Sequence, residues 1–450
     1  MKSDAVADVA IVGAGFSGTL AAAQLGKRGL GVMLIESGGR SGRGIAYSTR
    51  EAVHLLNVPA GKMSAWPDRP DDFVSAGHDA AAFAPRREFG VYLQSILDSA
   101  LENGVELIEA QAVSGVREHE RWRIGLSDGR TVSARALVLA QGNQPPEPMR
   151  VGQGIDSRLF IHNPWGEEAR AAVGRLAEEG GDALILGTGL TMVDMVLSLD
   201  AAGHRGRIVA LSRRGQMPRS HAPHDPARVS WDEVPQGNVL ALWRWLRKRS
   251  SAVGWRGAVD ALRPHAQALW RGLDEDEQRR FLRHARPYWD VHRHRIAPEV
   301  AEQLQRMIGE GRLEVMAGRV SGVRTEEGNL AVAYSRRGAS PTSLAFGEFP
   351  SPAGEEGSFG AVFNCTGPLG AMARTRDALL RQLIGDGLVA VDRLGIGLAV
   401  DGPSRAGDRL WALGPLTKGE FWEIVAVPDI REQVAAVADD IVRSLINEHS

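Results

Sequence analysis

The chain has a single cysteine, Cys365, among its 450 residues, and it has no apolar run long enough to cross a membrane. One cysteine cannot build a disulfide framework, a thiolate zinc site or a dithiol redox pair. The formal net charge is only −2, which gives no electrostatic reason to expect nucleic acid or a membrane surface as a partner. The short polar N-terminus is unlike a signal peptide. We therefore expect a soluble, cytoplasmic protein, and its oligomeric state stays open.

Glycine is abundant, at 53 residues, and some of it forms a turn near the N-terminus. Residues 8–36 read DVAIVGAGFSGTLAAAQLGKRGLGVMLIE, which predicts a strand, a glycine turn, a helix and a second strand. Glycines permit the sharp bend, the close approach of a pyrophosphate and tight helix packing, and the helix N-terminus attracts phosphate. An acid at the end of the second strand accepts hydrogen bonds from ribose hydroxyls. The residues predicted to bind a dinucleotide here are Gly13, Gly15, Phe16, Ser17, Gly18 and Glu36.

A second turn of the same kind follows in the stretch ALILGTGLTMVDMVLSLDAAGHRGRIVALSRR, residues 183–214. Met192 stands where the third glycine would be, so a wider contact between helix and strand is expected there. The second strand ends on two arginines instead of an acid, and guanidinium groups suit the 2′-phosphate of NADPH. NADH and a merely solvated basic turn are the alternatives. The residues predicted to bind are Gly187, Gly189, Leu190, Thr191, Arg213 and Arg214.

The pentapeptide VSGVR occurs at residues 113–117 and again at residues 320–324. Each copy lies in a stretch of strand-like residues that follows a helix and precedes a buried apolar run. We expect each copy to lie in the β-meander that completes a dinucleotide-binding unit. Two such units predict two nucleotides and electron transfer between them.

At this point the sequence resembles the bacterial FAD/NAD(P)-binding flavoproteins with two dinucleotide-binding domains, which are related to N-hydroxylating and flavin-containing monooxygenases. The resemblance is carried by VGAGFSG, AYSTREAVHLLNVPAGKMSAWPDRPDDF, GTGLTMVD and RPYWDVHRHRIAPE. It implies an α/β fold with two Rossmann-like domains, FAD at the first turn and NADPH (or NADH) at the second. The implied domains are 1–145 and 361–450 for FAD, and 155–360 for NAD(P)H with a helical insertion at about 225–298.

The resemblance also implies cofactor-binding residues outside the two turns. The irregular segment after the second strand would lie along FAD, unless it is only an ordered loop on the sheet edge. The last helix would point its N-terminus at the flavin, unless it is only a docking helix. The residues implied are Tyr47, Asn57, Met63, Gly142 and Gly414.

The stretch VHRHR, residues 291–295, collects two arginines and two histidines. Two histidines alone do not complete a metal site, so no metal is expected. A cationic cluster would hold an anionic substrate or the NADPH phosphates, and a solvent-facing cluster is the alternative. We name Arg293 and His294 as the candidates that position the substrate.

The resulting function hypothesis is an FAD-dependent monooxygenase in which NAD(P)H reduces the flavin and one atom of O2 passes to a small molecule. The substrate is expected to be anionic or to contain nitrogen, and ring hydroxylation of a purine such as urate is preferred. N-hydroxylation of an amine is one alternative, and a non-oxygenating flavoprotein that delivers electrons to a partner is another. A dithiol reductase of the same fold would need two cysteines, which excludes it.

Overall fold

The computed structural model describes residues 6–336 and 355–446, and the chain divides into two compact units. The first unit comprises the described residues of Met1–Gln144, His224–Arg286 and Leu369–Ser450. The second comprises those of Pro145–Pro223 and Pro287–Pro368. Each unit is built on a sheet with a parallel centre, which confirms the predicted α/β class with two Rossmann-like halves.

The sheet of the first unit runs in the order β14-β15-β6-β1-β2-β3, with β4 and β5 beyond this path. β1 pairs in parallel with both β2 and β6, so the strand that precedes the glycine turn lies at the centre. Its four last residues are buried, as expected for a strand covered on both faces. The strands are β1 (Val6–Val12), β2 (Val32–Glu36), β3 (Glu106–Glu109), β4 (Ala112–Glu118), β5 (Arg121–Leu126), β6 (Thr131–Leu139), β14 (Arg405–Gly407) and β15 (Leu410–Ala412).

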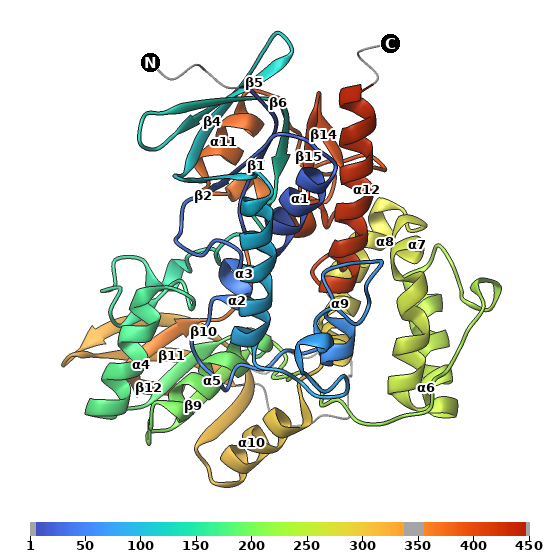
Figure 1. The fold of residues 1–450 in the computed structure, drawn as a ribbon. Coiled ribbons are helices and arrows are strands. Elements are labelled where there is room, and N and C mark those ends of the chain that lie inside the picture. The colour runs from blue at the N-terminus through green and yellow to red at the C-terminus, as the bar shows by residue number, and fades with distance from the viewer. Residues whose placement is uncertain (1–5, 337–354, 447–450) are drawn as a thin grey trace. The chain divides into compact units, whose positions relative to one another are not determined.

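Helices cover both faces of this sheet. Val9 and Ile11 of β1 face a core shared with α1, α3 and α12, whereas Ala10 and Val12 face a core shared with α11 and the meander. This alternation is the period of two that a strand imposes. α1 contacts both α3 and α12 (Figure 1). The helices are α1 (Phe16–Lys27), α2 (Gly44–Tyr47), α3 (Arg86–Glu102), α11 (Ala378–Gly385) and α12 (Val427–Ile446).

The sheet of the second unit runs in the order β12-β11-β10-β9-β8-β13-β7. β8, which precedes the second glycine turn, pairs in parallel with β9 and β13. The strands are β7 (Phe160–Ile161), β8 (Ala183–Leu186), β9 (Ile208–Ser212), β10 (Leu313–Glu326), β11 (Asn329–Arg336), β12 (Glu355–Phe359) and β13 (Ala361–Asn364). The helices are α4 (Glu167–Glu179), α5 (Leu190–Ala201) and α10 (Pro298–Gly309).

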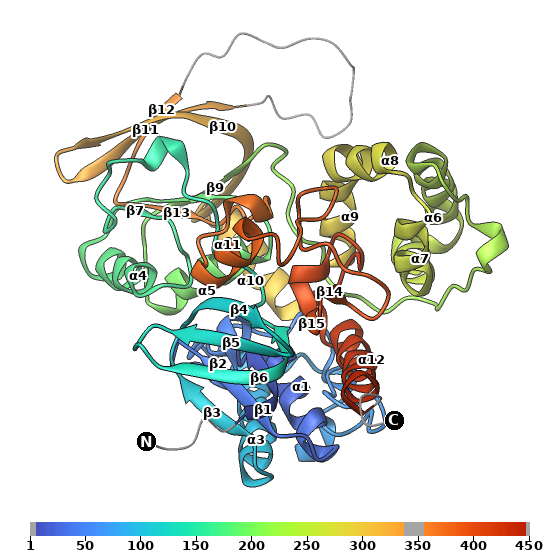
Figure 2. The ribbon, with the colours of Figure 1, turned by 90° about the horizontal axis from the view of Figure 1, so that it is seen from above.

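Both copies of VSGVR lie in antiparallel meanders, as the sequence predicts. The first copy is in β4, which pairs with β5, and β5 pairs with β6. The second is in β10, which pairs with β11, and β11 pairs with β12 (Figure 2). Each copy also contains a register shift, between Ala112 and Ser114 in the first and between Val320 and Gly322 in the second. The repeat therefore coincides with an irregularity in the antiparallel pairing of both meanders.

The helices in the expected insertion, residues 225–298, do not all belong to the second unit. They are α6 (Val239–Leu262), α7 (Ala266–Arg271), α8 (Glu275–Arg280), a π-helical turn Phe281–Ala285, and α9 (Arg286–Arg293). Residues 224–286, which include α6, α7, α8 and the π-helical turn, belong to the first unit, whereas α9 from Pro287 onward belongs to the second. The cause is a shared hydrophobic cluster: Trp270 stacks on Trp422 with ring centroids 4.8 Å apart, and its indole N–H donates to the Gly419 carbonyl at 2.8 Å.

Candidate functional site

Packing within the protein accounts for two of the three glycines in the first turn. Gly13 has φ of 103°, and a Cβ there would lie 2.6 Å from the Ala140 carbonyl oxygen. A Cβ on Gly18 would lie 1.7 Å from the Gly13 carbonyl oxygen, so α1 can sit this close to the turn only with glycine. Gly15 is different, because the nearest atom to its Cβ would be the Gly44 Cα at 3.5 Å. Glycine at this position fits the close approach of a ligand.

Glu36 is held beside the turn by backbone amides. One carboxylate oxygen accepts the Ala14 N–H at 2.8 Å, and the other accepts the Gly38 N–H at 3.0 Å. The first turn of α1 begins at Phe16, and no side chain caps it. Amide N–H groups at an uncapped helix start, next to a fixed carboxylate, suit a dinucleotide with its pyrophosphate on the helix and its ribose on the acid.

A second glycine-rich loop, residues 38–44, lies against the first glycine turn, and the sequence analysis did not single it out. Gly44 has φ of 56°, and a Cβ there would lie 2.9 Å from the Gly15 Cα. The hydroxyl of Ser41 in the same loop is buried and has no hydrogen-bond partner among the described residues. The signal was present in the sequence as four glycines in GGRSGRG, residues 38–44.

Two predicted aromatic residues meet on one ring. The Phe16 and Tyr47 rings both pack against Phe89 of α3, with centroids 6.3 and 4.7 Å away. Burial raises the pKa of Tyr47 to about 12, so its hydroxyl stays protonated at neutral pH. The structure thus brings Tyr47 to the start of α1.

Three other predicted residues differ in what they offer a ligand. Asn57 is half-buried beside Leu56, whose N–H bonds the Ala84 carbonyl. The Met63 side chain is only 3% exposed and packs in the protein's own core, so it presents little surface to a cofactor. Gly142 follows β6 with φ of 66° and open space around its Cβ position.

The C-terminal segment reaches the first turn through Gly414. A Cβ on Gly414, whose φ is 61°, would lie 2.9 Å from the Ser17 hydroxyl oxygen. The Gly414 N–H donates to the side-chain oxygen of Gln433 in α12 at 2.8 Å. The Gln433 amide in turn donates to Ser404 at 3.0 Å and to Thr417 at 2.9 Å. Gln433 therefore holds the segment around Gly414 in place next to the first turn of α1.

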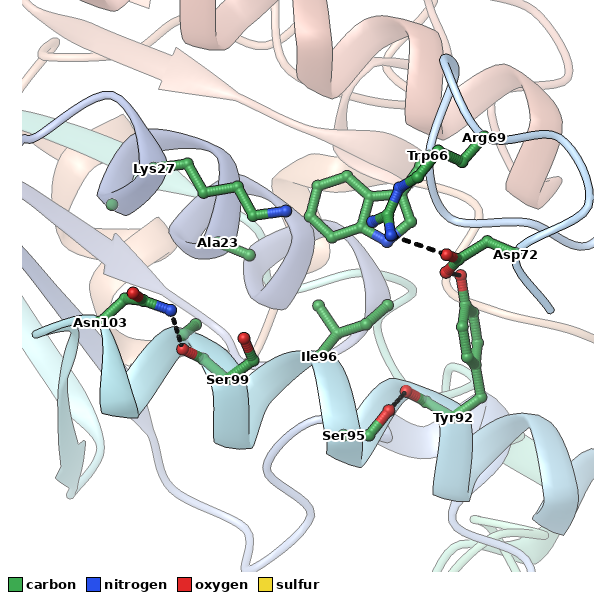
Figure 3. Close-up of a pocket in the computed structure, with 12 residues that line it drawn as sticks. Ala23, Lys27, Trp66, Arg69, Asp72, Tyr92, Ser95, Ile96, Ser99 and Asn103 are labelled. Atoms are coloured by element: carbon green, nitrogen blue, oxygen red, sulfur yellow. Dashed lines mark hydrogen bonds and ion pairs between the residues drawn. The ribbon is translucent and has the colours of Figure 1, made fainter. Parts of the chain in front are cut away.

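The irregular segment that the resemblance implies lies along FAD is held by side chains of α3 and α1. Tyr92 of α3 donates to Asp72 at 2.6 Å and accepts the Ala65 N–H at 3.1 Å. Trp66 lies between two cations, with the Lys27 ammonium 3.7 Å from its ring centroid and the Arg69 guanidinium 4.7 Å away (Figure 3). A cavity of about 220 Å³ at the C-terminal end of α1 is lined by Lys27, Trp66, Arg69, Asp72 and Tyr92 among others, whereas the glycine turn is at the N-terminal end of this helix.

The second turn repeats the geometry of the first. Gly187 has φ of 110°, and a Cβ there would lie 2.2 Å from the Cys365 carbonyl oxygen. Apart from the two chain neighbours of Gly189, no atom of the described residues lies within 4 Å of a Cβ position there, so this face is open to the rest of the described structure. α5 begins directly after Gly189 with Leu190 and Thr191, both half-buried. The open glycine and the helix start fit a second pyrophosphate.

The basic turn after β9 is braced within the second unit. Thr188 shares a hydrogen bond with Ser212 at 2.8 Å, which ties the turn to the glycine loop. Arg213 is exposed, and the Arg214 guanidinium lies over the ring of Tyr288 in α9, 5.5 Å from its centroid. Such stacking leaves the edge of a guanidinium available for a phosphate.

The VHRHR cluster lies beside this basic turn. Residues 219 and 221, a few positions after Arg214, exchange three backbone hydrogen bonds with residues 291 and 296: Arg219 N–H to Val291 O, Ile296 N–H to Arg219 O and His221 N–H to Ile296 O. Arg293 and His294 are half-buried at the end of α9. Their role in positioning a substrate stays a prediction, but the structure brings them together with the arginine turn of their own unit.

Cys365 is buried, and burial raises the pKa of its thiol far above the usual value, with Asp194 adding to the effect. Among residues 6–336 and 355–446, no group of histidine, cysteine and acidic side chains is arranged to hold a metal ion. None of the helices described is both long and apolar enough to span a membrane.

A known protein family resembles part of the first unit. Residues 10–144 match a family described as FAD-NAD(P)-binding. The matched residues all belong to the first unit. No curated protein sequence matches the chain.

Solved structures resemble the chain along nearly all of its length. The ornithine N-hydroxylase of Kutzneria sp. 744, solved with reduced FAD, NADP+ and L-ornithine, is 17% identical with a TM-score of 0.66, and covers 98% of this chain and 100% of its own. The reduced ornithine hydroxylase of Pseudomonas aeruginosa is also 17% identical, with a TM-score of 0.64 and the same coverage. A flavin monooxygenase from Stenotrophomonas maltophilia is 18% identical, with a TM-score of 0.55, covering 98% of this chain and 99% of its own. These likenesses show that the chain has the fold of flavoproteins with two dinucleotide-binding domains.

Proposed function

We propose that the chain is an FAD-dependent monooxygenase that oxidises NADPH and hydroxylates the nitrogen of a small amine. The observation that carries the cofactor part of this proposal is the opposite charge at the two turns. In the first, the amide-bound carboxylate of Glu36 can accept ribose hydroxyls but would repel a 2′-phosphate. In the second, Arg213 and the stacked Arg214 can neutralise one. Two turns with these properties suit FAD in the first unit and NADPH in the second.

The residues present fit both groups. Gly13, Gly15 and Gly18 shape the first cradle, and Gly187 and Gly189 the second. FAD, when bound, accepts a hydride from NADPH and activates O2. The chain's part is to hold the two nucleotides and to position the substrate, because the chemistry of the oxygen transfer belongs to the cofactor.

Nitrogen is favoured over a purine ring as the site of oxidation. The two ornithine hydroxylases above share the fold over the full length of both chains, and nothing in the structure favours urate, the substrate preferred from the sequence. A dithiol reductase is disfavoured by the single, buried Cys365.

A substrate panel tests the proposal. FAD-loaded protein is mixed with NADPH in air and with L-ornithine, L-lysine, putrescine or urate in turn. NADPH oxidation, hydrogen peroxide and hydroxylamine product are measured together. An amine that accelerates NADPH oxidation and yields a hydroxylamine supports N-hydroxylation. Product from urate alone would restore the purine hypothesis, and NADPH oxidation that yields only peroxide with every candidate would contradict the proposed substrate class.

A further inference from the structure

The first glycine turn shows how the residue between two glycines meets the end of the next strand. The Gly13 N–H donates to the Ile35 carbonyl oxygen at 2.8 Å. One residue further along each segment, the Ala14 N–H donates to the Glu36 carboxylate at 2.8 Å. The acid at the strand end is therefore held by a backbone amide, which almost any residue between the glycines would supply.

The second turn has the same plan with a different pair of residues. The Gly187 N–H donates to the Leu211 carbonyl oxygen at 2.8 Å, so Thr188 and Ser212 stand at the positions of the alanine and the acid. Here the contact joins two side chains, with the Thr188 and Ser212 hydroxyl oxygens 2.8 Å apart. Thr188 is only 6% exposed. A hydroxyl pair, Thr188 and Ser212, thus takes the place of an amide and a carboxylate.

The protons of this hydroxyl pair can be assigned from a third contact. The Thr188 hydroxyl lies 2.5 Å from the Gln216 carbonyl oxygen, which can only accept a hydrogen bond. Because a hydroxyl has one proton, Thr188 donates to Gln216, and the proton of Ser212 must go to Thr188. The Ser212 oxygen in turn accepts the Gly215 N–H at 3.0 Å. Ser212 therefore has no proton left to donate to a phosphate.

The same contacts close the loop that carries the two arginines. Both arginines lie within the loop 212–216, and each end of this loop is bonded to the hydroxyl pair. Behind the loop, Gly215 has φ of 61°, and a Cβ there would lie 2.8 Å from the backbone nitrogen of Ala317 in β10. The loop is pressed against the sheet on one side and tied to the glycine turn on the other. Little freedom is left to the backbone that presents the guanidinium groups.

We propose that Thr188 is a positioning residue for the 2′-phosphate of the coenzyme, and that it acts through Ser212 and the loop 212–216 without touching the coenzyme. The inference rests on the proposed function, because it concerns the turn assigned there to NADPH. It adds that the choice between NADPH and NADH depends on a buried hydroxyl as well as on the arginines. Without this hydroxyl, Ser212 and Gln216 lose their partner, and the loop can relax away from the phosphate.

Two mononucleotides test this without turnover: 2′,5′-ADP, which carries the 2′-phosphate, and 5′-AMP, which lacks it. Each is titrated by calorimetry into FAD-loaded protein, and the ratio of the two dissociation constants is the readout. Thr188→Val removes the hydroxyl and keeps the shape of the side chain. We expect it to weaken binding of 2′,5′-ADP about tenfold, or about 1.4 kcal/mol, and binding of 5′-AMP little. A merely structural role would weaken binding of both probes alike.

Further variants make the test specific. Thr188→Ser keeps the hydroxyl and should restore the wild-type ratio. Ser212→Ala breaks the same hydrogen bond from the other side, so it should lose as much as Thr188→Val, and the double variant should lose no more than either alone. Thr325→Val is the matched control, because Thr325 is an exposed threonine of β10 in the same unit, and it should leave the ratio unchanged. If Thr188→Val is unstable, Thr188→Ala replaces it, since the first turn has alanine at this position.

An unchanged ratio in the variants of Thr188 that lack the hydroxyl would overturn the proposal. A loss confined to Ser212→Ala would also overturn it, because Ser212 would then act on the phosphate itself. An equal loss in Thr325→Val would show that the ratio does not report on the turn. Wild-type protein that binds 5′-AMP as tightly as 2′,5′-ADP would instead contradict the proposed coenzyme, so the failure of the positioning role and the failure of the proposed function give different results.

Discussion

The first glycine turn offers a pair of substitutions with the same chemistry and opposite expected effects. In Gly15→Ala, the new Cβ finds only the Gly44 Cα at 3.5 Å, and φ of −77° is accessible to alanine. In Gly18→Ala, the new Cβ would lie 1.7 Å from the Gly13 carbonyl oxygen, so backbone must move. The first change should spare the fold and block the ligand, and the second should damage the fold itself.

The magnitudes follow from the two environments. Alanine in place of glycine at a helix N-cap costs about 0.5–1 kcal/mol, so Gly15→Ala without FAD should unfold close to wild type. Overpacking against backbone costs about 1–3 kcal/mol or more, so Gly18→Ala should be clearly less stable. Bound FAD should add about 2.7 kcal/mol to wild type at one hundred times its Kd, and this increment should vanish in Gly15→Ala.

The assay is chemical unfolding of each protein with and without added FAD, together with FAD content after purification. A Gly15→Ala variant that keeps full FAD content and the full stability increment would refute the assignment of the first turn. A Gly18→Ala variant as stable as wild type would refute the packing account of α1.

Three further changes test other parts of the molecule. Replacing Arg213 and Arg214 by glutamine should raise KM for NADPH more than tenfold and leave KM for NADH nearly unchanged, because a hydrogen bond to a charged group contributes about 1.5–3 kcal/mol and only NADPH has the 2′-phosphate. Arg293→Ala or His294→Ala should leave FAD content and KM for NADPH unchanged but raise the ratio of peroxide to product, because a misplaced substrate is not oxidised. Burial, with a smaller effect of Arg286, lowers the pKa of Lys418 to about 8 from the usual 10.5, so Lys418→Met should be more stable than wild type by up to roughly 3 kcal/mol at pH 6. Between pH 8 and 10.5 the folded wild type has lost this proton and the unfolded chain keeps it, so wild-type stability rises and the advantage of the variant disappears.

Each of these has an outcome against it. Equal effects on KM for NADPH and for NADH would show that Arg213 and Arg214 do not bind the 2′-phosphate. A raised KM for NADPH with unchanged coupling would assign Arg293 and His294 to the coenzyme, and the backbone hydrogen bonds of their neighbours Val291 and Ile296 to residues 219 and 221 agree with that assignment. A difference between Lys418→Met and wild type that does not change from pH 6 to 10.5 would show that the ammonium is not buried at a cost.

The parts of the fold that were predicted correctly depend on patterns within short stretches of the sequence. The strand, turn and helix of each glycine motif lie within about 30 consecutive residues, so apolar runs and glycine positions are enough to place them. The VSGVR copies were likewise placed correctly in meanders. The assignment of the helical segment could not be predicted, because it depends on Trp270 stacking on Trp422, and no local pattern tells which core a helix will join.

The site shows the same limit. Glu36 could be named because an acid at the end of the second strand is part of the motif itself, and its role toward a ribose stays a prediction. Gly44 was missed because its role is a contact with Gly15, 29 residues earlier, that periodicity does not reveal. Met63 was named from the resemblance, and the irregular pattern of its segment did not reveal that its side chain packs in the core; its role toward FAD stays a prediction.

The central claim is that the two turns hold FAD and NADPH and that the reduced flavin reacts with O2. Rapid mixing tests it directly: FAD-loaded protein is reduced by NADPH without oxygen and is then mixed with aerated buffer and amine. We predict fast bleaching of the flavin by NADPH, followed by an oxygen-dependent spectral transient before the yellow colour returns and by hydroxylated product. Flavin that is not reduced by NADPH, or that returns in a single phase without product while reducing an added electron acceptor, would contradict the account.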